Sequence, residues 1–247
     1  TLFPYTTLFR SIAGEKISAL AITEPSGGSD VAALKTKAVR DGDYYIVSGE
    51  KTFITSGIRA DYYTVAVRTD PNGQGPKGIS MLLMDAHSEG ITKSPLKKMG
   101  WWASDTAHLH FDEVRVPVSH LLGQENAGFK VIMNNFNMER FWLGAIAYGY
   151  ALVCYEEALE WAQQRKTFGK RLIDHQVVRH KLVDMATQLT ATRALLEDTA
   201  YRMGKKNCKV VSSLHRYQCL RTLLLVRCNS VLMLRYRPWV VWDLCEV

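Results

Sequence analysis

The sequence predicts an α+β protein in which an antiparallel β-barrel or sandwich domain is followed by an incomplete antiparallel helical bundle domain. Up to about Pro117, short segments rich in β-branched and aromatic residues alternate with Gly, Asn and Asp turn signals. From about Asn126, apolar residues recur at helical spacing instead. This change of period places the boundary between the two domains near residue 125.

The first domain contains several segments with strand character: 44–47, 51–55, 62–69, 79–84 and 108–116. Turn signals such as Asn72-Gly73 separate them, and no helical pattern lies between them. Short strands in unbroken succession are typical of antiparallel sheets, so we expect a barrel or a sandwich.

The second domain reads as helical over 128–152, again over about 152–165, and then from Asp174 to about Met203. Asp174 is a plausible N-cap for this last helix, because Asp accepts hydrogen bonds from the free backbone amides of a helix start. Val178, Leu182, Met185, Leu189, Leu196 and Met203 approximate an apolar stripe along it.

The net charge of +7 does not indicate a nucleic-acid partner, because the charge is concentrated at one end. Residues 205–247 hold eight basic and two acidic residues, whereas residues 1–204 hold 23 basic and 22 acidic ones, a net of only +1. Four of the five cysteines also lie in 205–247, without metal-ligand spacing. No apolar run approaches the roughly 18 residues of a membrane span. We therefore expect a soluble cytoplasmic protein in a reducing compartment.

Three clusters could hold a ligand, and each also has an ordinary structural reading. Thr23 to Asp30 would let backbone amides approach a polar or anionic ligand, although Pro and Gly also form plain turns. Phe53-Ile54-Thr55 ends a strand with an aromatic ring and a hydroxyl, which also suit ordinary strand packing. Arg165 to Lys170, followed by His175-Gln176, could clamp a pyrophosphate or complement a helix dipole.

Two further clusters carry acidic residues or histidines. Asn137 to Arg140 place Glu139 within a helix, where a Glu is usually solvated or paired locally. His108 and His110 share a strand face and Asp112 follows, but no further cluster completes a zinc pattern. We expect no metal.

Taken together, these segments resemble the acyl-CoA dehydrogenase family, in unbroken order from about Ile12 to Met203. The motifs are Thr-Glu-Pro-x-x-Gly-Ser-Asp (23–30), Gly-x-Lys-x-Phe-Ile-Thr (49–55), Lys-Met-Gly (98–100), Ser-Asp-Thr (104–106), Phe-Asp-Glu-Val-Arg-Val-Pro (111–117), Leu-Gly (122–123), Gly-Phe (128–129), 165–170 and His-Gln (175–176). The family places a β-domain between helical domains, which agrees with the change of period.

The resemblance implies an FAD enzyme that removes the α-proton of an acyl-CoA thioester while the β-hydrogen leaves as hydride to flavin N5, giving the trans-2-enoyl-CoA. It implies electron-transfer flavoprotein as acceptor, a homotetramer, and the mitochondrial matrix if the source is eukaryotic. The residues that it implies around FAD are Thr23, Ser29, Phe53, Ile54, Thr55, Arg165, Phe168 and Gln176. Ser29, Asn137, Met138, Glu139 and Arg140 would line the acyl-CoA site.

Glu139 is the candidate base, by similarity to the isovaleryl- and long-chain branches, which carry the base on this helix directly before an Arg. Most of the family carries it nearer the C-terminus instead, so that alternative stays open. Two other functions also stay open: an acyl-CoA oxidase, which passes electrons to oxygen, and a truncated, non-catalytic acyl-CoA or flavin-binding remnant.

Both ends depart from the family pattern. Residues 1–11 match nothing in it, so we divide the chain into a non-family leader (1–11), a middle β-domain (12–125), a partial C-terminal helical domain (126–204) and an aberrant tail (205–247). In the tail, a shifted frame lets residues 236–247 encode a Gly-Gly-x-Gly turn like that of the family. We expect a frameshift between about Lys209 and Arg216, and a fragment that could itself be inactive.

Overall fold

The computed structural model describes residues 10–73 and 75–204. They fall into two compact units that meet between Met133 and Asn134, and each unit is described by itself. The expected leader, except for residues 10 and 11, and the expected aberrant tail lie outside the described residues.

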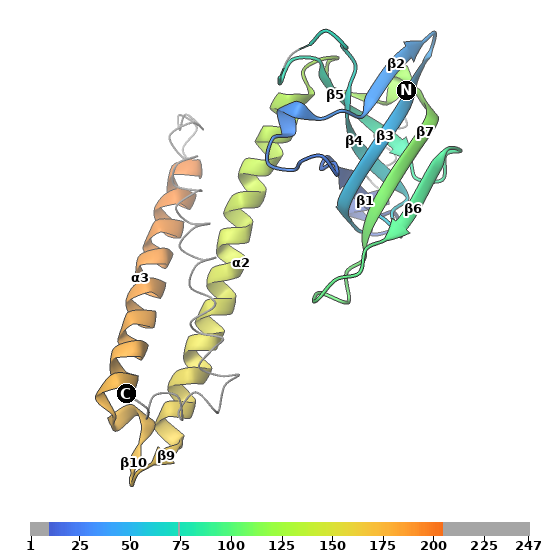
Figure 1. The fold of residues 1–247 in the computed structure, drawn as a ribbon. Helices are drawn as coiled ribbons and strands as arrows, with labels where there is room; N and C mark the ends of the chain where they lie inside the picture. The colour runs from blue at the N-terminus through green and yellow to red at the C-terminus, as the bar shows by residue number, and fades with distance from the viewer. Residues whose placement is uncertain (1–9, 74, 205–247) are drawn as a thin grey trace. The chain divides into compact units, whose positions relative to one another are not determined.

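The first unit is built on one eight-stranded sheet (Figure 1). Its strands are β1 Ser18–Ala21, β2 Lys37–Asp41, β3 Tyr44–Thr55, β4 Tyr62–Arg68, β5 Ile79–Asp85, β6 Ile91–Pro95, β7 Thr106–Pro117 and β8 Leu121–Leu122. They follow the order β6-β7-β3-β2-β4-β5-β8, and β1 pairs with β4 outside this path. Two 3-10 helices, η1 (Val31–Ala33) and η2 (Val118–His120), lie in the connections.

The expected closed barrel is wrong, because the described strands form a single open sheet. β6 and β8, at the two ends of the order, are not paired with each other. Most neighbours are antiparallel as predicted, but β1 and β2 both pair with β4 in parallel. Apolar alternation shows which face of a strand is buried, but not which strand ends a sheet, so it could not separate an open sheet from a barrel.

The core of this unit lies on one face of the long β3–β7 pair. Tyr45 stands opposite Val116, and Ile54 stands opposite Ala107. All four pack in one buried apolar cluster with residues of β1, β4 and β5. The residues of β5 from Ile79 to Met84 are all buried, which explains the continuous apolar run there.

Helix α2 (Gly128–Gln164) begins against the sheet and is one continuous helix, where the sequence indicated two successive segments. At its first residue, a Cβ would stand 2.8 Å from the carbonyl carbon of Ser80. Only glycine allows this approach, so Gly128 lets the first residue of α2 pack directly against the backbone of β5.

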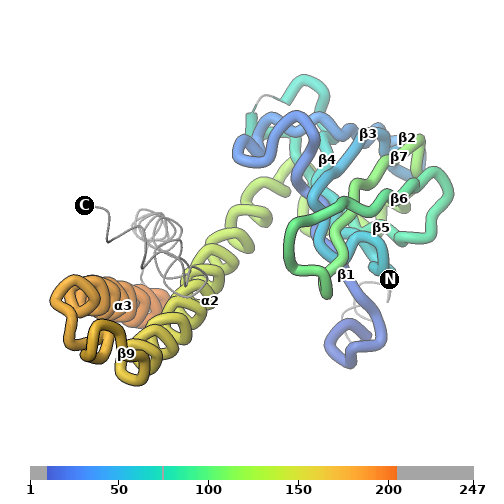
Figure 2. The backbone as a smooth tube through the Cα atoms, turned by 60° about the horizontal axis from the view of Figure 1, so that its bottom comes forward, coloured from blue at the N-terminus to red at the C-terminus, as the bar shows by residue number. Residues whose placement is uncertain are grey.

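The second unit continues α2 and adds α3 (Gln176–Gly204), which runs in the opposite direction (Figures 1 and 2). Between them lie a hairpin, β9 (Lys166–Thr167) with β10 (Lys170–Arg171), and a 3-10 helix, η3 (Leu172–Asp174). The predicted N-cap is wrong, because Asp174 ends η3 and accepts hydrogen bonds from Arg171 instead. No helix in the described ranges is long and apolar enough to cross a membrane.

Candidate functional site

The Thr23–Asp30 segment forms a tight turn directly after β1. The backbone amide of Glu24 donates to the Gly27 carbonyl (3.2 Å), and the Gly27 amide donates back to the Glu24 carbonyl (3.0 Å). Pro25 and Ser26 therefore occupy a two-residue turn, and Ser29 follows it on the exposed surface. The sequence correctly indicated a turn, and this one leaves the Ser29 side chain accessible to a ligand.

The Phe53–Thr55 segment lies at a register shift in β3, between Lys51 and Ile54. Phe53 has a φ of 58°, a left-handed conformation that is a genuine outlier for an aromatic residue, and its side chain is 70% exposed. Thr55 is also exposed, whereas Ile54 is only 2% exposed and packs in the core. A ligand on this face could contact the Phe53 ring and the Thr55 hydroxyl, but of Ile54 only the backbone.

The structure brings these two segments together within the first unit. The Thr52 amide donates to the Thr23 carbonyl at 2.8 Å, and the Lys51 ammonium donates to the Ile22 carbonyl at 3.1 Å. Two clusters that lie almost thirty residues apart in the sequence therefore form one surface.

A buried ion pair, Glu24–Lys51, lies beneath this surface, and the sequence analysis assigned no role to either residue. The Lys51 ammonium lies 2.9 Å from Oε1 of Glu24, and the side chains are 0% and 5% exposed. Burial lowers the pKa of Lys51 to about 8 although Glu24 opposes the change. Burial also acts to raise the pKa of Glu24, but the Lys51 charge and hydrogen bonds from Thr36 and Lys35 outweigh it and hold that pKa below its usual value.

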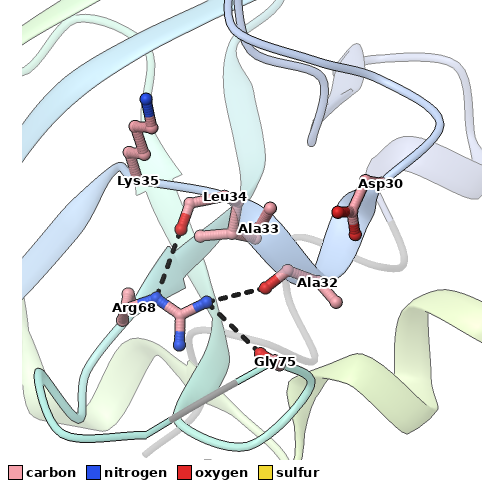
Figure 3. Close-up of a pocket in the computed structure, with 7 residues that line it drawn as sticks. All are labelled: Asp30, Ala32, Ala33, Leu34, Lys35, Arg68 and Gly75. Carbon is pink, nitrogen blue, oxygen red and sulfur yellow. Dashed lines mark hydrogen bonds between the residues drawn. The ribbon is translucent and has the colours of Figure 1, made fainter.

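A pocket of about 460 Å³ in the first unit is lined by Asp30, Ala32, Ala33, Leu34, Lys35, Arg68 and Gly75 (Figure 3). The Arg68 guanidinium donates to five backbone carbonyls, those of Ala32, Leu34, Gly73, Gly75 and Lys77. These five bonds use all the N–H donors of the guanidinium. Arg68 therefore organises the pocket wall and is not a receptor for an anion.

The residues predicted to line the acyl-CoA site lie on α2, in the second unit. Glu139 is exposed and accepts a hydrogen bond from the Asn135 amide at 2.6 Å. Arg140 donates to Oδ1 of Asn137 at 3.3 Å, and its guanidinium lies over the Phe136 ring, 5.9 Å from the centroid. Asn137 is buried and Met138 is exposed. The convergence of this helix with the Thr23 and Phe53 segments stays a prediction.

The β9–β10 hairpin holds the predicted pyrophosphate-binding cluster. Phe168 and Gly169 form its two-residue turn, with φ values of 50° and 76°, as a type I′ turn requires. The Phe168 side chain is 82% exposed, and Arg165 and Gln176, at the two ends of the connection, are exposed as well. His175 contacts Thr167 through Nε2, so it ties the hairpin to the start of α3.

The histidine pair on β7 lies beside an acidic residue. His108 and His110 both face Glu50, at 3.6 and 3.5 Å. Among the residues that the structure describes, no group of three or more His, Cys, Asp or Glu could hold a metal ion.

Each unit, taken by itself, holds residue types that fit one part of a flavin dinucleotide. Three exposed aromatic residues among those described have left-handed backbones: Phe53 and Trp101 in the first unit and Phe168 in the second. Such strain persists only where the surroundings enforce it and clusters at ligand sites. Thr55 adds a hydroxyl beside Phe53, and Arg165 adds a guanidinium near Phe168. In the first unit, an exposed ring and a hydroxyl donor suit a flat polar ring system. In the second unit, taken by itself, an exposed ring and a guanidinium suit a pyrophosphate group.

Comparisons with known proteins agree with this fit. Residues 19–114 match the family model described as acyl-CoA dehydrogenase, middle domain, and residues 126–225 match acyl-CoA dehydrogenase, C-terminal domain. The second match extends past residue 204.

Two relatives show how much of such a protein is present. Cyclohexane-1-carbonyl-CoA dehydrogenase of Geobacter metallireducens is 41% identical over 206 residues, which are 82% of this chain and 54% of the relative. The mitochondrial long-chain specific acyl-CoA dehydrogenase of Sus scrofa is 39% identical over 187 residues, 75% of this chain and 44% of the relative. The chain thus spans about half the length of these relatives.

Solved structures share the fold. A probable acyl-CoA dehydrogenase from Mycobacterium abscessus has a TM-score of 0.85 at 40% identity, covering 93% of this chain and 61% of that one. The FAD complex of PigA has a TM-score of 0.83 at 25% identity, covering 89% and 56%.

Proposed function

The chain belongs to the acyl-CoA dehydrogenase family, and from that premise we propose that it takes part in the α,β-dehydrogenation of an acyl-CoA thioester to the trans-2-enoyl-CoA. The observation that carries the proposal is the joined surface of the first unit. There the left-handed, exposed Phe53 and the Thr55 hydroxyl follow Thr52, which is hydrogen-bonded to Thr23.

FAD is the proposed cofactor, and when bound it supplies the oxidant that accepts the β-hydrogen as hydride at N5. Thr23, Ser29, Phe53 and Thr55 would hold the flavin end, with the Thr55 hydroxyl as a donor and Ile54 contributing its backbone. Arg165, Phe168 and Gln176 would hold the dinucleotide end, in the neighbouring subunit's cofactor.

Glu139 is the proposed base for the α-proton. It is exposed in this structure and its carboxylate accepts a hydrogen bond from Asn135, so a substrate could cover it. A carboxylate within hydrogen-bond reach of the α-carbon can act as a general base in its deprotonated form. Asn137, Met138 and Arg140 on the same helix, together with Ser29, would line the acyl-CoA site.

We also propose that α2 and α3 belong to a helical bundle in a homotetramer. Large apolar side chains on both helices are exposed, among them Trp142, Leu143, Tyr150, Trp161 and Val183. Exposed apolar area of this kind usually marks an interaction surface. Electron-transfer flavoprotein is the proposed acceptor, and the proposed compartment is the cytoplasm, or the mitochondrial matrix in a eukaryote.

The test is to incubate the 247-residue chain with FAD, remove unbound FAD, and add a panel of acyl-CoA thioesters without oxygen. We expect bound flavin in stoichiometric amount and bleaching of its visible absorption by at least one thioester. A chain that retains no FAD, or whose flavin no thioester bleaches, would contradict the proposal and leave the non-catalytic reading. Rapid reoxidation of the bleached flavin in air would instead indicate an oxidase.

A further inference from the structure

We propose that the buried Glu24–Lys51 pair is a positioning device, which holds the Thr23–Ser29 turn and the Phe53–Thr55 bulge in one fixed arrangement. The inference rests on the proposed function, since it assigns both segments to the flavin. Neither Glu24 nor Lys51 contacts the flavin in this proposal. The pair acts through the residues that follow Glu24 and Lys51 in the chain.

Glu24 connects three segments of the first unit. Its Oε1 accepts from the Lys51 ammonium at 2.9 Å and from the Thr36 amide at 2.8 Å, and its Oε2 accepts from the Lys35 amide at 2.6 Å. One side chain therefore ties the turn after β1 to the start of β2 and to the middle of β3.

Lys51 reaches the turn from the other side. Its side chain is fully buried, and its ammonium donates both to Glu24 and to the Ile22 carbonyl at 3.1 Å. The next residue, Thr52, donates its amide to the Thr23 carbonyl. Side chain and backbone thus hold the segment after β1 against β3 at adjacent positions, directly before the bulge begins.

The bulge needs such support because it contains Phe53 in a left-handed conformation. A non-glycine residue in this region costs free energy and persists only where its surroundings determine the backbone. On the far side, Ile54 is fixed by core packing. The Glu24–Lys51 pair holds the backbone directly before the bulge, so the Phe53 ring and the Thr55 hydroxyl keep one orientation.

Stability alone does not explain the pair. Removing two charges from water is so costly that apolar replacements of similar size often give a protein of equal or greater stability. A buried pair that joins three segments through six named atoms specifies a geometry that apolar packing would leave loose.

The experiment compares the wild-type chain with E24Q/K51M, which removes both charges at nearly constant volume, and with Lys16→Met. Lys16 is the matched control: it forms an ion pair with Asp61 at 2.6 Å in the same unit and touches neither segment. Amide hydrogen exchange of residues 23–29 and 52–55 is measured without FAD, and the FAD dissociation constant and the absorption spectrum of the bound flavin are measured with it.

We expect E24Q/K51M to keep the circular dichroism spectrum of the wild type. The amide hydrogens of the two segments should exchange at least tenfold faster. FAD should bind at least tenfold more weakly, and the absorption spectrum of the bound flavin should shift. Lys16→Met should change none of these. Unchanged exchange in E24Q/K51M would overturn the inference whether or not the chain binds FAD. Faster exchange with a wild-type FAD affinity and spectrum would also overturn it. If instead the wild type binds no FAD, the proposed function fails, and the exchange experiment alone decides the positioning role.

Discussion

The ammonium nitrogen of Lys51 lies 2.9 Å from Oε1 of Glu24 in a site that water barely reaches. Removing one partner of a buried pair leaves an uncompensated charge and costs roughly 3–5 kcal/mol, whereas replacing both is often close to neutral. We therefore expect Lys51→Met to lower the free energy of unfolding by about 3 kcal/mol. In E24Q/K51M most of this loss should be recovered.

Urea denaturation followed by circular dichroism measures both changes. Lys16→Met serves as the control, because its ion pair with Asp61 is partly exposed and such pairs contribute about 1 kcal/mol or less. Equal losses for Lys51→Met and Lys16→Met would contradict the assignment of a strong coupling to Glu24 and Lys51.

The same pair predicts a dependence of stability on alkaline pH. Burial lowers the pKa of Lys51 from 10.5 to about 8. Between these values the unfolded chain binds more protons than the folded chain, so the contribution of Lys51 to stability rises with pH. It is complete above pH 10.5 and is lost as the pH falls through about 8.

Denaturation at pH 7 to 10 tests this, with the stability of E24Q/K51M subtracted at each pH. We expect the difference, wild type minus variant, to increase across the range. The series stops near pH 10 because burial raises the pKa of Tyr63 to about 12, so this tyrosine titrates in the unfolded chain first above that point. A flat difference would show that Lys51 keeps an ordinary pKa in the folded chain, and a falling one that its pKa is raised; either would contradict this prediction.

How far the sequence could predict the fold depended on whether the signal was local. The segments predicted at 62–69 and 79–84 correspond to β4 and β5, because continuous apolar and β-branched runs identify strands by themselves. The parallel pairing of β1 and β2 with β4 has no local signal. Asp174 looked like an N-cap because its residue type fits one, yet Arg171 three residues earlier engages it instead.

The site shows the same division. Thr23 and Phe53 were predicted separately. The hydrogen bond that joins their segments, from Thr52 to Thr23, links the turn after β1 to β3, and no local pattern predicts this contact. The bulge at Phe53 also has no local signal. Lys51 and Thr52 are both buried, which breaks the alternation of the strand, but a charged and a polar residue do not indicate burial in a sequence. The burial of Glu24 and Lys51 was not predicted, because charged residues are rarely buried. Both residues appeared in the predicted motifs without a role of their own.

Glu139 offers a direct test of the proposed base. Loss of a general base costs roughly 10²- to 10⁴-fold in rate, so Glu139→Gln should slow flavin bleaching by an acyl-CoA by this factor while FAD content stays the same. Glu160→Gln is the matched control: Glu160 is also exposed on α2 and also accepts from an amide side chain four residues away, that of Gln164.

Stopped-flow absorbance under anaerobic conditions measures the bleaching rate of both variants. A Glu139→Gln variant that bleaches as fast as the wild type would remove Glu139 from the mechanism and favour a base nearer the C-terminus. Equal slowing by Glu160→Gln would point to a general effect on the helix instead.

We expect the left-handed backbone of Phe53 to lower the stability of the fold and its ring to strengthen FAD binding. Its φ of 58° is strained for any residue with a Cβ, and this conformation costs roughly 1–2 kcal/mol that glycine does not incur. Phe53→Gly should therefore be more stable than Phe53→Ala by about 1 kcal/mol, because only the former relieves the backbone.

Both variants lack the ring, so both should bind FAD more weakly, by roughly two- to tenfold, as expected for the loss of one aromatic contact. Tyr44→Ala provides the control, since Tyr44 is an exposed aromatic at the other end of β3 and packs against Arg115. Urea denaturation gives the stabilities, and fluorescence titration gives the FAD affinities. If Phe53→Gly binds FAD as tightly as the wild type, the left-handed conformation serves the backbone alone, and the Phe53 ring is not a flavin contact.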